Sequence, residues 1–408
     1  MRIGVAGPFN PACVREYIKE ENVPEFNANA SSVNIYVKSL IEMENHVIIF
    51  TCDQNAKRSY VLNGSNIRIY CISRNFRFKG LGRFRVHYRI CECIRNEIQN
   101  LDVLHAEWTY EYAMAARSFA KQIPTFCSVR DWCPYLLSAA KGWKDKYYWL
   151  MSYYMFCKVM ECRDMRFIAN SEYTKNQINN AYPEHEVKTI PNPIESKYIL
   201  KDTKVYPDEK KFVSISYALH EPHKNIRKLL QAFQLYLNKK EMGRGAELLL
   251  IGKYDADWKN ELESVGLLNG VRLLGAMSHK DIFGVLDGCS CLVHPSLEET
   301  FGNILLEAMC RRVPCIGGDK SGAVPQVLGY GACGILCDVE KPESIADAMI
   351  KIDNIALVDR IVEEGTKRLL ESYADNIVVR MHMGLFEAKD TIWKQKKKSE
   401  NSLSLKKN

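Results

Sequence analysis

Two carboxylates lie eight residues apart in the stretch LEETFGNILLEAM, which covers residues 297–309. Glu299 belongs to a polar turn, and Glu307 lies among apolar residues that fit a helix starting near Gly302. Backbone N–H groups at a helix start bind anions such as phosphate, and a glycine lets a ligand approach the backbone closely. Hydrogen bonds from a hydroxylated ligand would offset the cost of burying Glu307. The stretch therefore predicts a site for a sugar joined to a nucleoside diphosphate.

A structural interpretation of the same two acids stays open at this point. Glu299 near the start of a helix would complement the helix dipole, and Glu307 would lie on a solvated helix face. Residue types and spacing alone do not decide between a ligand site and an ordinary helix start.

The longer segment EETFGNILLEAMCRRVPCIGG (298–318) resembles the signature of the retaining glycosyltransferases of family four, which have the GT-B fold. As in this chain, that signature has a glutamate, seven residues, a second glutamate, Ala-Met, and a strand after a proline. The resemblance continues in SGAVPQVL (321–328), IPNPI (190–194) and ANSEYTK (169–175), and it covers nearly the whole chain. It implies a nucleotide-sugar donor and transfer of the sugar to an acceptor.

The resemblance assigns donor-site roles to residues of the second half of the chain. In this family the residue that matches Glu299 contacts the donor sugar, and the one that matches Glu307 contacts the ribose. Lys224 matches a lysine that neutralises the leaving phosphates. Glu299 and Lys224 are thereby implied as catalytic residues. Further donor contacts are implied for Met277, Phe301, Gly302, Asn303 and Ile304.

This chain departs from the family pattern at two places. The arginine that usually accompanies Lys224 falls near Ala218. His220 and His223 are candidates for a replacement charge, and an exposed histidine without this role is the alternative for each. Family members also carry a Gly-Gly loop after the first strand, where this chain has FNANASSVN (26–34). These departures keep a catalytically inactive nucleotide-sugar-binding homologue open as an alternative.

The first half of the chain supplies further candidates by resemblance. His105 matches the first position of a His-x-His segment, and Glu107 replaces the second histidine. In SVRDWCPY (128–135), Arg130 takes the place of a histidine and is followed by Asp131. The resemblance implies catalytic roles for His105 and Glu107 and acceptor binding by Arg130 and Asp131. A satisfied histidine at a strand end is the alternative for His105.

Two sets of alternating strands and helices must position these residues. Short β-branched runs alternate with amphipathic segments, which indicates parallel sheets built from β-α-β units. Open sheets of this kind bind ligands at the carboxyl ends of their strands. We therefore expect an α/β protein of GT-B type, with two doubly wound, Rossmann-like domains facing across a cleft. The predicted strands cover residues 2–7, 46–52, 66–73, 101–108, 123–129, 166–170, 211–218, 246–252, 271–276, 291–295 and 313–318.

A segment rich in proline and charge, 183–211, interrupts the alternation and is typical of a linker. It separates a predicted acceptor-binding domain, 1–196, from a predicted nucleotide-sugar-binding domain, 197–371. A helix at about 372–392 is expected to pack back on the first domain. Residues 393–408 are basic and polar, and we expect them to form a disordered tail.

The net charge of +7 is concentrated where basic residues stand beside aromatic ones, at 74–89 and 141–149. Such segments suit an anionic membrane surface, or else they form an ordinary solvated face. No run reaches the roughly 18 apolar residues of a spanning helix, and no signal peptide is recognised. We expect a cytoplasmic protein at the inner face of the membrane, whose fifteen cysteines are free thiols.

Taken with the resemblance, these features predict a retaining glycosyltransferase that moves a sugar from a UDP- or GDP-sugar to a glycan or lipid-linked acceptor in bacterial surface polysaccharide synthesis. No metal, other cofactor or nucleic acid partner is expected. The Asp-x-Asp in YDADW (254–258) follows a strand, where aspartate commonly caps a helix. A nucleotide-sugar epimerase of the same fold is the second enzymatic alternative.

Overall fold

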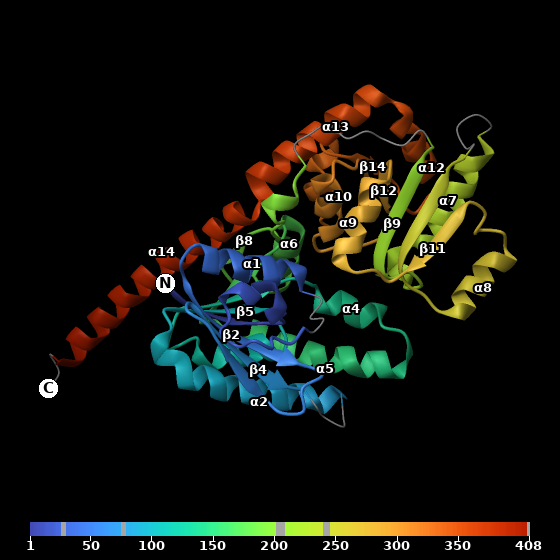
Figure 1. Cartoon of the computed structure of the whole chain (residues 1–408). Helices are drawn as coiled ribbons and strands as arrows, with labels where there is room; N and C mark the ends of the chain where they lie inside the picture. Colours follow the sequence, from blue (N-terminus) through green and yellow to red (C-terminus); the bar gives the residue numbers. More distant parts are fainter. Residues whose placement is uncertain (26–29, 75–78, 201–208, 240–244, 406–408) are drawn as a thin grey trace. The chain divides into compact units, whose positions relative to one another are not determined.

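The computed structural model describes residues 1–25, 30–74, 79–200, 209–239 and 245–405. The chain divides into two compact units, which are seen in Figure 1. Unit 1 consists of Met1–Pro193 and Asp375–Asn408, and unit 2 consists of Ile194–Ala374. Parts of three segments discussed above, at 26–29, 75–78 and 201–208, lie outside the described residues. The predicted cleft between the two domains stays a prediction.

Unit 1 is built on an eight-stranded sheet in the order β3-β4-β2-β1-β5-β6-β7-β8. Neighbouring strands are parallel, except that β3 and β4 pair antiparallel. The central strands are almost entirely buried and apolar, as expected when helices cover both faces of a parallel sheet. The strands are β1 (Arg2–Ala6), β2 (His46–Asp53), β3 (Tyr60–Asn63), β4 (Ile67–Ser73), β5 (Val103–Glu107), β6 (Thr125–Val129), β7 (Met165–Ala169) and β8 (Val187–Thr189).

Two strands of this sheet were not predicted from the sequence. β8 lies inside the segment predicted to be a linker, so that prediction is wrong at Val187–Thr189. Only Val187 of this strand is buried, and a three-residue strand with a lysine in the middle shows no apolar run. β3 is also a short edge strand, of four residues, of which only Leu62 is buried.

The helices of unit 1 are α1 (Ser31–Glu42), α2 (Lys79–Glu97), α3 (Glu111–Ala116), α4 (Cys133–Ala139), α5 (Gly142–Met160), α6 (Glu172–Ala181) and α14 (Asp375–Leu405). The last helix packs against α1 (Figure 1). Its Val378, Val379, Met383 and Phe386 belong to the core of unit 1. α14 continues to Leu405, whereas the sequence predicts disorder from residue 393. The segment contains no proline and many residues of high helix propensity, which favours continuation of the helix.

Unit 2 has a six-stranded, fully parallel sheet in the order β11-β10-β9-β12-β13-β14. Its strands are β9 (Lys211–Ala218), β10 (Glu247–Lys253), β11 (Val271–Gly275), β12 (Cys291–His294), β13 (Cys315–Gly318) and β14 (Ile335–Cys337). Its helices are α7 (Ile226–Asn238), α8 (Ala256–Ser264), α9 (His279–Asp287), α10 (Asn303–Cys310), α11 (Val324–Val327), α12 (Pro342–Ile350) and α13 (Ile355–Arg368). The predicted fold class, α/β with two parallel sheets, is confirmed.

The strand order reverses once in each sheet. In unit 1 the reversal lies between β1 and β5, and in unit 2 it lies between β9 and β12. The loops that leave these strands diverge to opposite faces of the sheet, and this opens a crevice for ligands at the carboxyl ends. Each unit therefore has one topological place where a binding site is expected.

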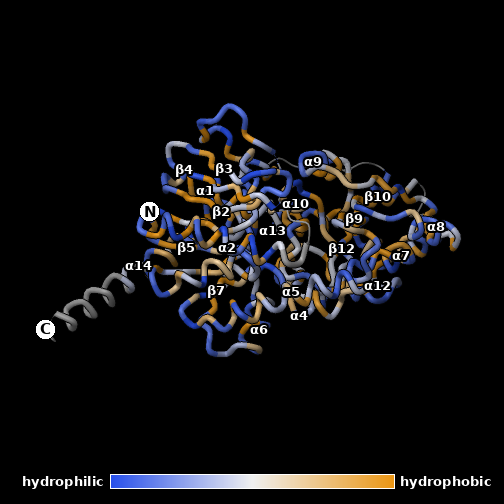
Figure 2. The backbone as a smooth tube through the Cα atoms, turned by 90° about the horizontal axis from the view of Figure 1, so that it is seen from below, coloured by the Kyte–Doolittle hydropathy of each residue, from blue (hydrophilic) through white to orange (hydrophobic). Residues whose placement is uncertain are grey.

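Hydrophobic segments gather along the strands of both units, as the orange parts of Figure 2 show. All fifteen cysteines are free thiols, and most of them are buried in these cores. Within the described part of the chain, no helix combines the length and the apolar character that membrane crossing requires.

Candidate functional site

The place where the strand order of unit 2 predicts a crevice lies between the loops that follow β9 and β12, and hydrogen bonds tie these two loops together. Asn225, in the left-handed region at φ 57°, donates its side-chain amide to the carbonyl of Pro295 at 3.1 Å. The amide N–H of Leu297 donates to the carbonyl of His223 at 2.8 Å. Side chains from both loops are thereby held at the same place.

Lys224 and Glu299 meet in this crevice. Nζ of Lys224 lies 2.7 Å from Oε1 of Glu299, and the two side chains are 19% and 18% exposed. Nε2 of His294, the last residue of β12, lies 3.3 Å from the same oxygen. Burial alone would raise the pKa of Glu299, but Lys224 and His294 together hold it well below its usual range. Glu299 is therefore ionised at neutral pH.

The backbone of Glu299 is fixed by the segment SGAVP, which resembles a family motif. The amide N–H of Ala323 donates to the carbonyl of Glu299 at 2.8 Å. Gly322 has φ +59°, and a Cβ at this position would lie 2.3 Å from the same carbonyl oxygen. Only glycine allows this approach, so that the motif sets the position of the carboxylate.

Helix α10 begins beside this cluster. Gly302 precedes it with φ 88°, a conformation that favours glycine. Phe301 is buried and packs edge-on against Tyr373, which anchors the turn. Asn303 and Ile304, the first two residues of the helix, are partly exposed. The free N–H groups of a helix start are suited to an anion.

Glu307 lies further along α10 and has a different partner. Nε2 of His279, the first residue of α9, donates to Oε1 of Glu307 at 2.9 Å. This hydrogen bond raises the pKa of His279, although burial acts in the opposite direction. The structure thus pairs Lys224 with Glu299 directly, whereas the Glu307 carboxylate is bound by a histidine.

His294 and His279 were not among the residues predicted from the sequence. Nε2 of His294 is buried and makes no hydrogen bond of acceptable geometry within the described residues, despite its closeness to Glu299. A polar residue at the end of the apolar run CLVH was the signal available for His294. No comparable signal marked His279, because its partner lies on another helix.

Neither His220 nor His223 contacts the Glu299 carboxylate in the ion pairs of this site. His220 is exposed. His223 is paired with Glu221 at 3.3 Å, and burial followed by the charge of Lys224 lowers its pKa. Ala218 is buried at the end of β9. Among the described residues, the side chains that form ion pairs with the Glu299 carboxylate are Lys224 and His294.

Met277 lies in the loop between β11 and α9. Its side chain is half-buried and packs against one of the apolar clusters of unit 2. Gly275, two residues earlier, has φ +73° with open space around it. The loop is therefore open to a planar group such as a base, as the resemblance implies.

In unit 1, His105 is fully buried and its two ring nitrogens are both bonded. Nδ1 lies 2.9 Å from the hydroxyl of Tyr36, and Nε2 lies 2.8 Å from the hydroxyl of Ser128. Burial lowers the pKa of His105 to about 3, so that the ring is neutral. The geometry agrees with the alternative of a satisfied structural histidine and leaves no nitrogen for a substrate.

Glu107 and Arg130 form a buried ion pair with each other. Nε and Nη2 of Arg130 donate to the two carboxylate oxygens of Glu107 at 2.5 and 3.0 Å. Arg130 also donates to the side chain of Asn192. The two side chains are thus bonded to each other and to Asn192 within the protein. Their implied catalytic and acceptor roles are therefore not supported by their placement.

Asp131 lies on the edge of a cavity in unit 1. It accepts a hydrogen bond from the hydroxyl of Tyr110 at 2.9 Å. Burial raises the pKa of Asp131 to about 6, although Tyr110 and Arg83 act against this rise. Of the residues predicted for the acceptor, Asp131 is the one that lines a cavity.

The Asp-x-Asp segment caps a helix, as expected. The side chain of Asp255 accepts from the amide N–H of Trp258 at 2.7 Å and begins α8. Among the described residues, no group of three or more potential ligands is arranged for a metal ion. The absence of a cofactor stays a prediction.

Comparison with known proteins agrees with these features. The family model described as Glycosyl transferases group 1 matches residues 200–368, and the model described as Glycosyltransferase Family 4 matches residues 32–198. The chain is 27% identical over 179 residues to N-acetyl-alpha-D-glucosaminyl L-malate synthase of Bacillus anthracis, across 42% of this chain and 45% of that protein. It is 26% identical over 157 residues to the capsular polysaccharide biosynthesis glycosyltransferase CapM of Staphylococcus aureus, across 38% and 40%. The chain thus spans under half the length of these relatives.

A solved structure shares the fold over almost the whole chain. Sucrose-phosphate synthase from Thermosynechococcus elongatus superposes with a TM-score of 0.75, covering 96% of this chain and all of that one. Its sequence identity is 14%, so the similarity concerns the fold alone.

Proposed function

Because the chain belongs to the glycosyltransferases of family four, we propose that it moves a sugar with retention from a UDP- or GDP-sugar to a glycan or lipid-linked acceptor. One observation carries the proposal: Lys224, Glu299 and His294 meet beside the start of α10, at the strand reversal of unit 2. A cation, an acid and a helix start at one crevice suit a diphosphate with a hydroxylated group attached.

The charges of this site can stabilise the negative charge of a departing diphosphate. Negative charge grows on the phosphate oxygen as its bond to the sugar breaks. Lys224 and the N–H groups of α10 supply positive potential at that position, and preorganised charge of this kind is a major source of rate enhancement. The ionised Glu299 accepts hydrogen bonds from the sugar hydroxyls and holds the ring next to the diphosphate.

The proposed transfer needs no nucleophilic side chain. The bond between the anomeric carbon and the phosphate oxygen breaks, and a bond from the acceptor oxygen to the same carbon forms on the same face. The proton of the acceptor hydroxyl passes to the departing phosphate oxygen. Lys224 takes the part that a metal cation plays in other transferases, so the proposal includes no metal.

The acceptor is proposed to be surface-bound, and α5 supports this. Four large side chains, Trp143, Tyr147, Leu150 and Tyr154, recur at intervals of four, three and four residues and are 76, 45, 55 and 47% exposed. They form one exposed apolar stripe of the helix. Lysines at 141, 144, 146 and 158 accompany the stripe, against the acids Asp145 and Glu161, and Glu161 pairs with Lys158 at 2.7 Å. A basic helix with interfacial aromatic residues suits an anionic membrane, where lipid-linked acceptors lie. The name of the CapM relative points to the same kind of pathway, synthesis of a surface polysaccharide.

A thermal-shift screen with nucleotide-diphosphate sugars tests the proposed donor class. A ligand that binds only the folded state raises the melting temperature by mass action. We expect a UDP- or GDP-sugar to give the largest shift and the free sugar to give none. Proton NMR of the best donor incubated alone would show a new epimer if the protein were an epimerase. If no nucleotide sugar shifts the transition at millimolar concentration, the proposed function is wrong.

A further inference from the structure

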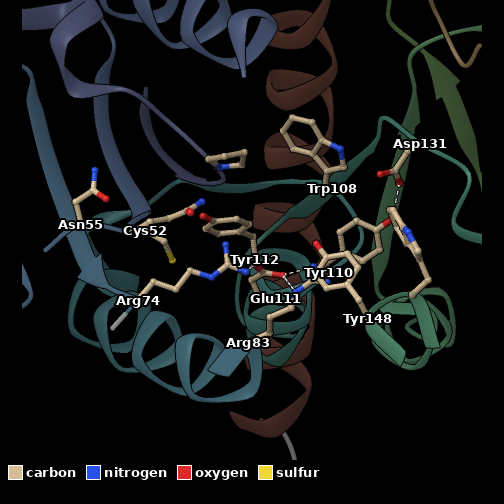
Figure 3. Close-up of a pocket in the computed structure, with 13 residues that line it drawn as sticks. Cys52, Asn55, Arg74, Arg83, Trp108, Tyr110, Glu111, Tyr112, Asp131 and Tyr148 are labelled. Carbon is tan, nitrogen blue, oxygen red and sulfur yellow. Dashed lines mark hydrogen bonds and ion pairs between the residues drawn. The ribbon is translucent and has the colours of Figure 1, made fainter. Parts of the chain in front are cut away.

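The cavity that Asp131 lines has a volume of about 460 Å³, lies within unit 1 and is shown in Figure 3. Its lining comes from the residues directly after β1, β2, β4, β5 and β6, and from α2, α3 and α5. The cavity therefore occupies the place at which this sheet reverses its strand order. Its lining residues are Pro8, Cys52, Gln54, Asn55, Arg74, Arg83, Trp108, Tyr110, Glu111, Tyr112, Asp131, Tyr148 and Trp149.

One of the two arginines in this cavity, Arg83, is buried and bonded within the protein. Nε and Nη2 of Arg83 donate to Oε2 of Glu111 at 2.8 and 2.5 Å, and the guanidinium also donates to Ser152. The same guanidinium lies over the rings of Tyr110 and Tyr148 at 4.8 and 4.9 Å. Its side chain is 3% exposed. Arg83 thus uses three of its five N–H donors within the protein, and its burial leaves little of the guanidinium accessible to a ligand.

Arg74 is different. Its Nη2 lies 3.8 Å from Oε1 of Glu111, beyond hydrogen-bond distance, and its side chain is 28% exposed. Figure 3 shows both arginines converging on this single carboxylate. Residues 75–89, which follow Arg74 in the chain, include no acid. Arg83 takes the stronger contacts of Glu111, so that Arg74 offers a partly exposed guanidinium to the cavity.

The remaining lining suits a carbohydrate. Trp108, Tyr148 and Trp149 offer flat apolar surfaces, while Gln54 and Asn55 offer amides. Trp108 has φ +63°, and a bulky residue in this left-handed conformation stores backbone strain of the kind found at ligand sites. Aromatic faces pack on the C–H groups of a sugar ring, and amides bind its hydroxyls.

We propose that this cavity binds the acceptor by an anionic group, a phosphate or a carboxylate, that pairs with Arg74. The attached sugar ring lies along the aromatic wall of Trp108, Tyr148 and Trp149. A guanidinium forms two parallel hydrogen bonds to either kind of anion, which makes Arg74 a suitable partner for it. The assignment of the ligand as acceptor depends on the proposed function, whereas the anion site itself does not.

Binding of small probes to the full chain tests this inference. Glucose 6-phosphate, glucuronate and glucose are titrated by calorimetry or saturation-transfer NMR. We expect the two anionic sugars to bind roughly tenfold or more tightly than glucose, the factor that a charge-assisted hydrogen bond supports. Arg74→Gln should remove this advantage, and Arg74→Lys should restore part of it. Arg163→Gln is the matched control, because Arg163 is exposed ahead of β7, at the opposite end of the sheet.

Two further binding measurements locate the anion site and identify the source of the anion. Lys224→Met should leave the binding of glucose 6-phosphate unchanged, because that lysine belongs to unit 2. A farnesyl-diphosphate-linked saccharide in detergent is compared with glucose 6-phosphate. If the affinity of either probe depends on Arg74, the inference is supported. The probe that binds more tightly shows whether the anion comes from a lipid diphosphate or from a soluble sugar.

Three results would overturn the inference. They are equal binding of glucose and the anionic sugars, unchanged binding by Arg74→Gln, and loss of binding in Lys224→Met alone. The thermal shift by nucleotide sugars, measured on the same samples, reports separately on the donor site. A normal donor shift together with any of these results would refute the anion site and leave the proposed function intact.

Discussion

Glu299 carries the negative charge on which the proposed donor site depends, and its neighbours keep that charge in place. Lys224 and His294 approach the same carboxylate oxygen from two different loops. Removing one member of a well-buried ion pair commonly costs 3–5 kcal/mol. Lys224 and Glu299 are each nearly one-fifth exposed, so that water can solvate the partner that remains. Function should therefore suffer more than folding when this pair is broken.

Replacing Glu299 with Gln keeps the shape of the side chain and removes its charge. We expect kcat/KM for sugar transfer to fall by about 100-fold or more, as when other preorganised polar groups are removed. Circular dichroism should stay unchanged. Glu263→Gln is the control, since it breaks the exposed ion pair of Glu263 with Lys259 on α8 of the same unit. Transfer by Glu299→Gln at the wild-type rate would remove this residue from the mechanism.

The pair of His279 and Glu307 gives stability a pH dependence of known sign. The hydrogen bond to Glu307 raises the pKa of His279, so that the charged ring stabilises the folded state. This contribution is complete below the ordinary histidine pKa and is lost as pH rises through the raised value. The difference in unfolding free energy between wild type and Glu307→Gln should therefore shrink from pH 5.5 to pH 8.5, as urea denaturation can measure. A difference that stays constant over this range would show that the pair does not titrate as described.

At the residue scale, the sequence identified the acids and missed the histidines. Glu299 and Lys224 are separated by 75 positions, yet each stands in a recognisable segment after a strand, and the structure joins them. The contact of His279 with Glu307 depends on how two helices pack, which no local pattern shows. His105 matched a family position and Glu107 and Arg130 replaced histidines at two others, but the burial and pairing of these residues were not visible in the sequence.

At the scale of elements, the turn at Gly322 fixes Glu299 and offers a sharp test. Gly322→Ala would place a Cβ 2.3 Å from the carbonyl oxygen of Glu299, in addition to the cost of φ +59°. We expect a loss of stability of about 1–3 kcal/mol and a loss of donor binding. Gly266→Ala is the matched control, because Gly266 has φ +70° and nothing within 4 Å of the added Cβ. Donor binding that is equal in both variants would exclude a positioning role for this turn.

The exposed stripe of α5 predicts binding to anionic vesicles. The double variant Trp143→Ala with Tyr147→Ala removes two of its aromatic anchors, and we expect most co-sedimentation with phosphatidylglycerol vesicles to be lost. Ile355→Ala is the control, since Ile355 is also large and 74% exposed but lies on α13 in unit 2. Binding by wild type should weaken as salt rises, because lysine charges contribute to it. If wild type shows no preference for anionic over neutral vesicles, α5 is only a solvated face.

Long apolar elements were predictable, and short or polar ones were not. β2 and β9 occupy nearly the predicted ranges, because their β-branched runs are buried on both faces. β8 and β14 have three residues each, too few to show a period. The end of α14 was predicted as disordered from its polar composition, but its lysines, its glutamine and its glutamate have high helix propensity.

At the scale of the whole molecule, each unit has polar groups at the place where the strand order of its sheet reverses. Unit 1 has Arg74 and Asp131 around an aromatic cavity, and unit 2 has Lys224 and Glu299 at the start of α10. The family motifs of the sequence identified this fold class and the site in unit 2. They did not predict the cavity in unit 1, because its lining comes from five strand ends and three helices.

Asp131 lines the cavity of unit 1, and its buried carboxyl group should make the stability of the protein depend on pH. Burial raises the pKa of Asp131 to about 6, so that the folded state opposes its ionisation. Stability therefore decreases as pH rises from the ordinary aspartate pKa through about 6. Asp131→Asn should gain stability relative to wild type between pH 5 and pH 7.5, as urea titrations of both proteins can measure. If the difference in unfolding free energy between the two proteins stays constant across this pH range, the raised pKa of Asp131 is contradicted.

The most direct test of the account is calorimetric titration of the best nucleotide sugar into wild type, Lys224→Met and Lys259→Met. Lys259 forms an exposed pair with Glu263 on α8 and serves as the matched lysine. The account predicts that Lys224→Met binds the nucleotide sugar at least tenfold more weakly, while Lys259→Met binds like wild type. Equal affinities in all three proteins would show that the diphosphate does not bind beside Lys224 and Glu299, and would contradict the account.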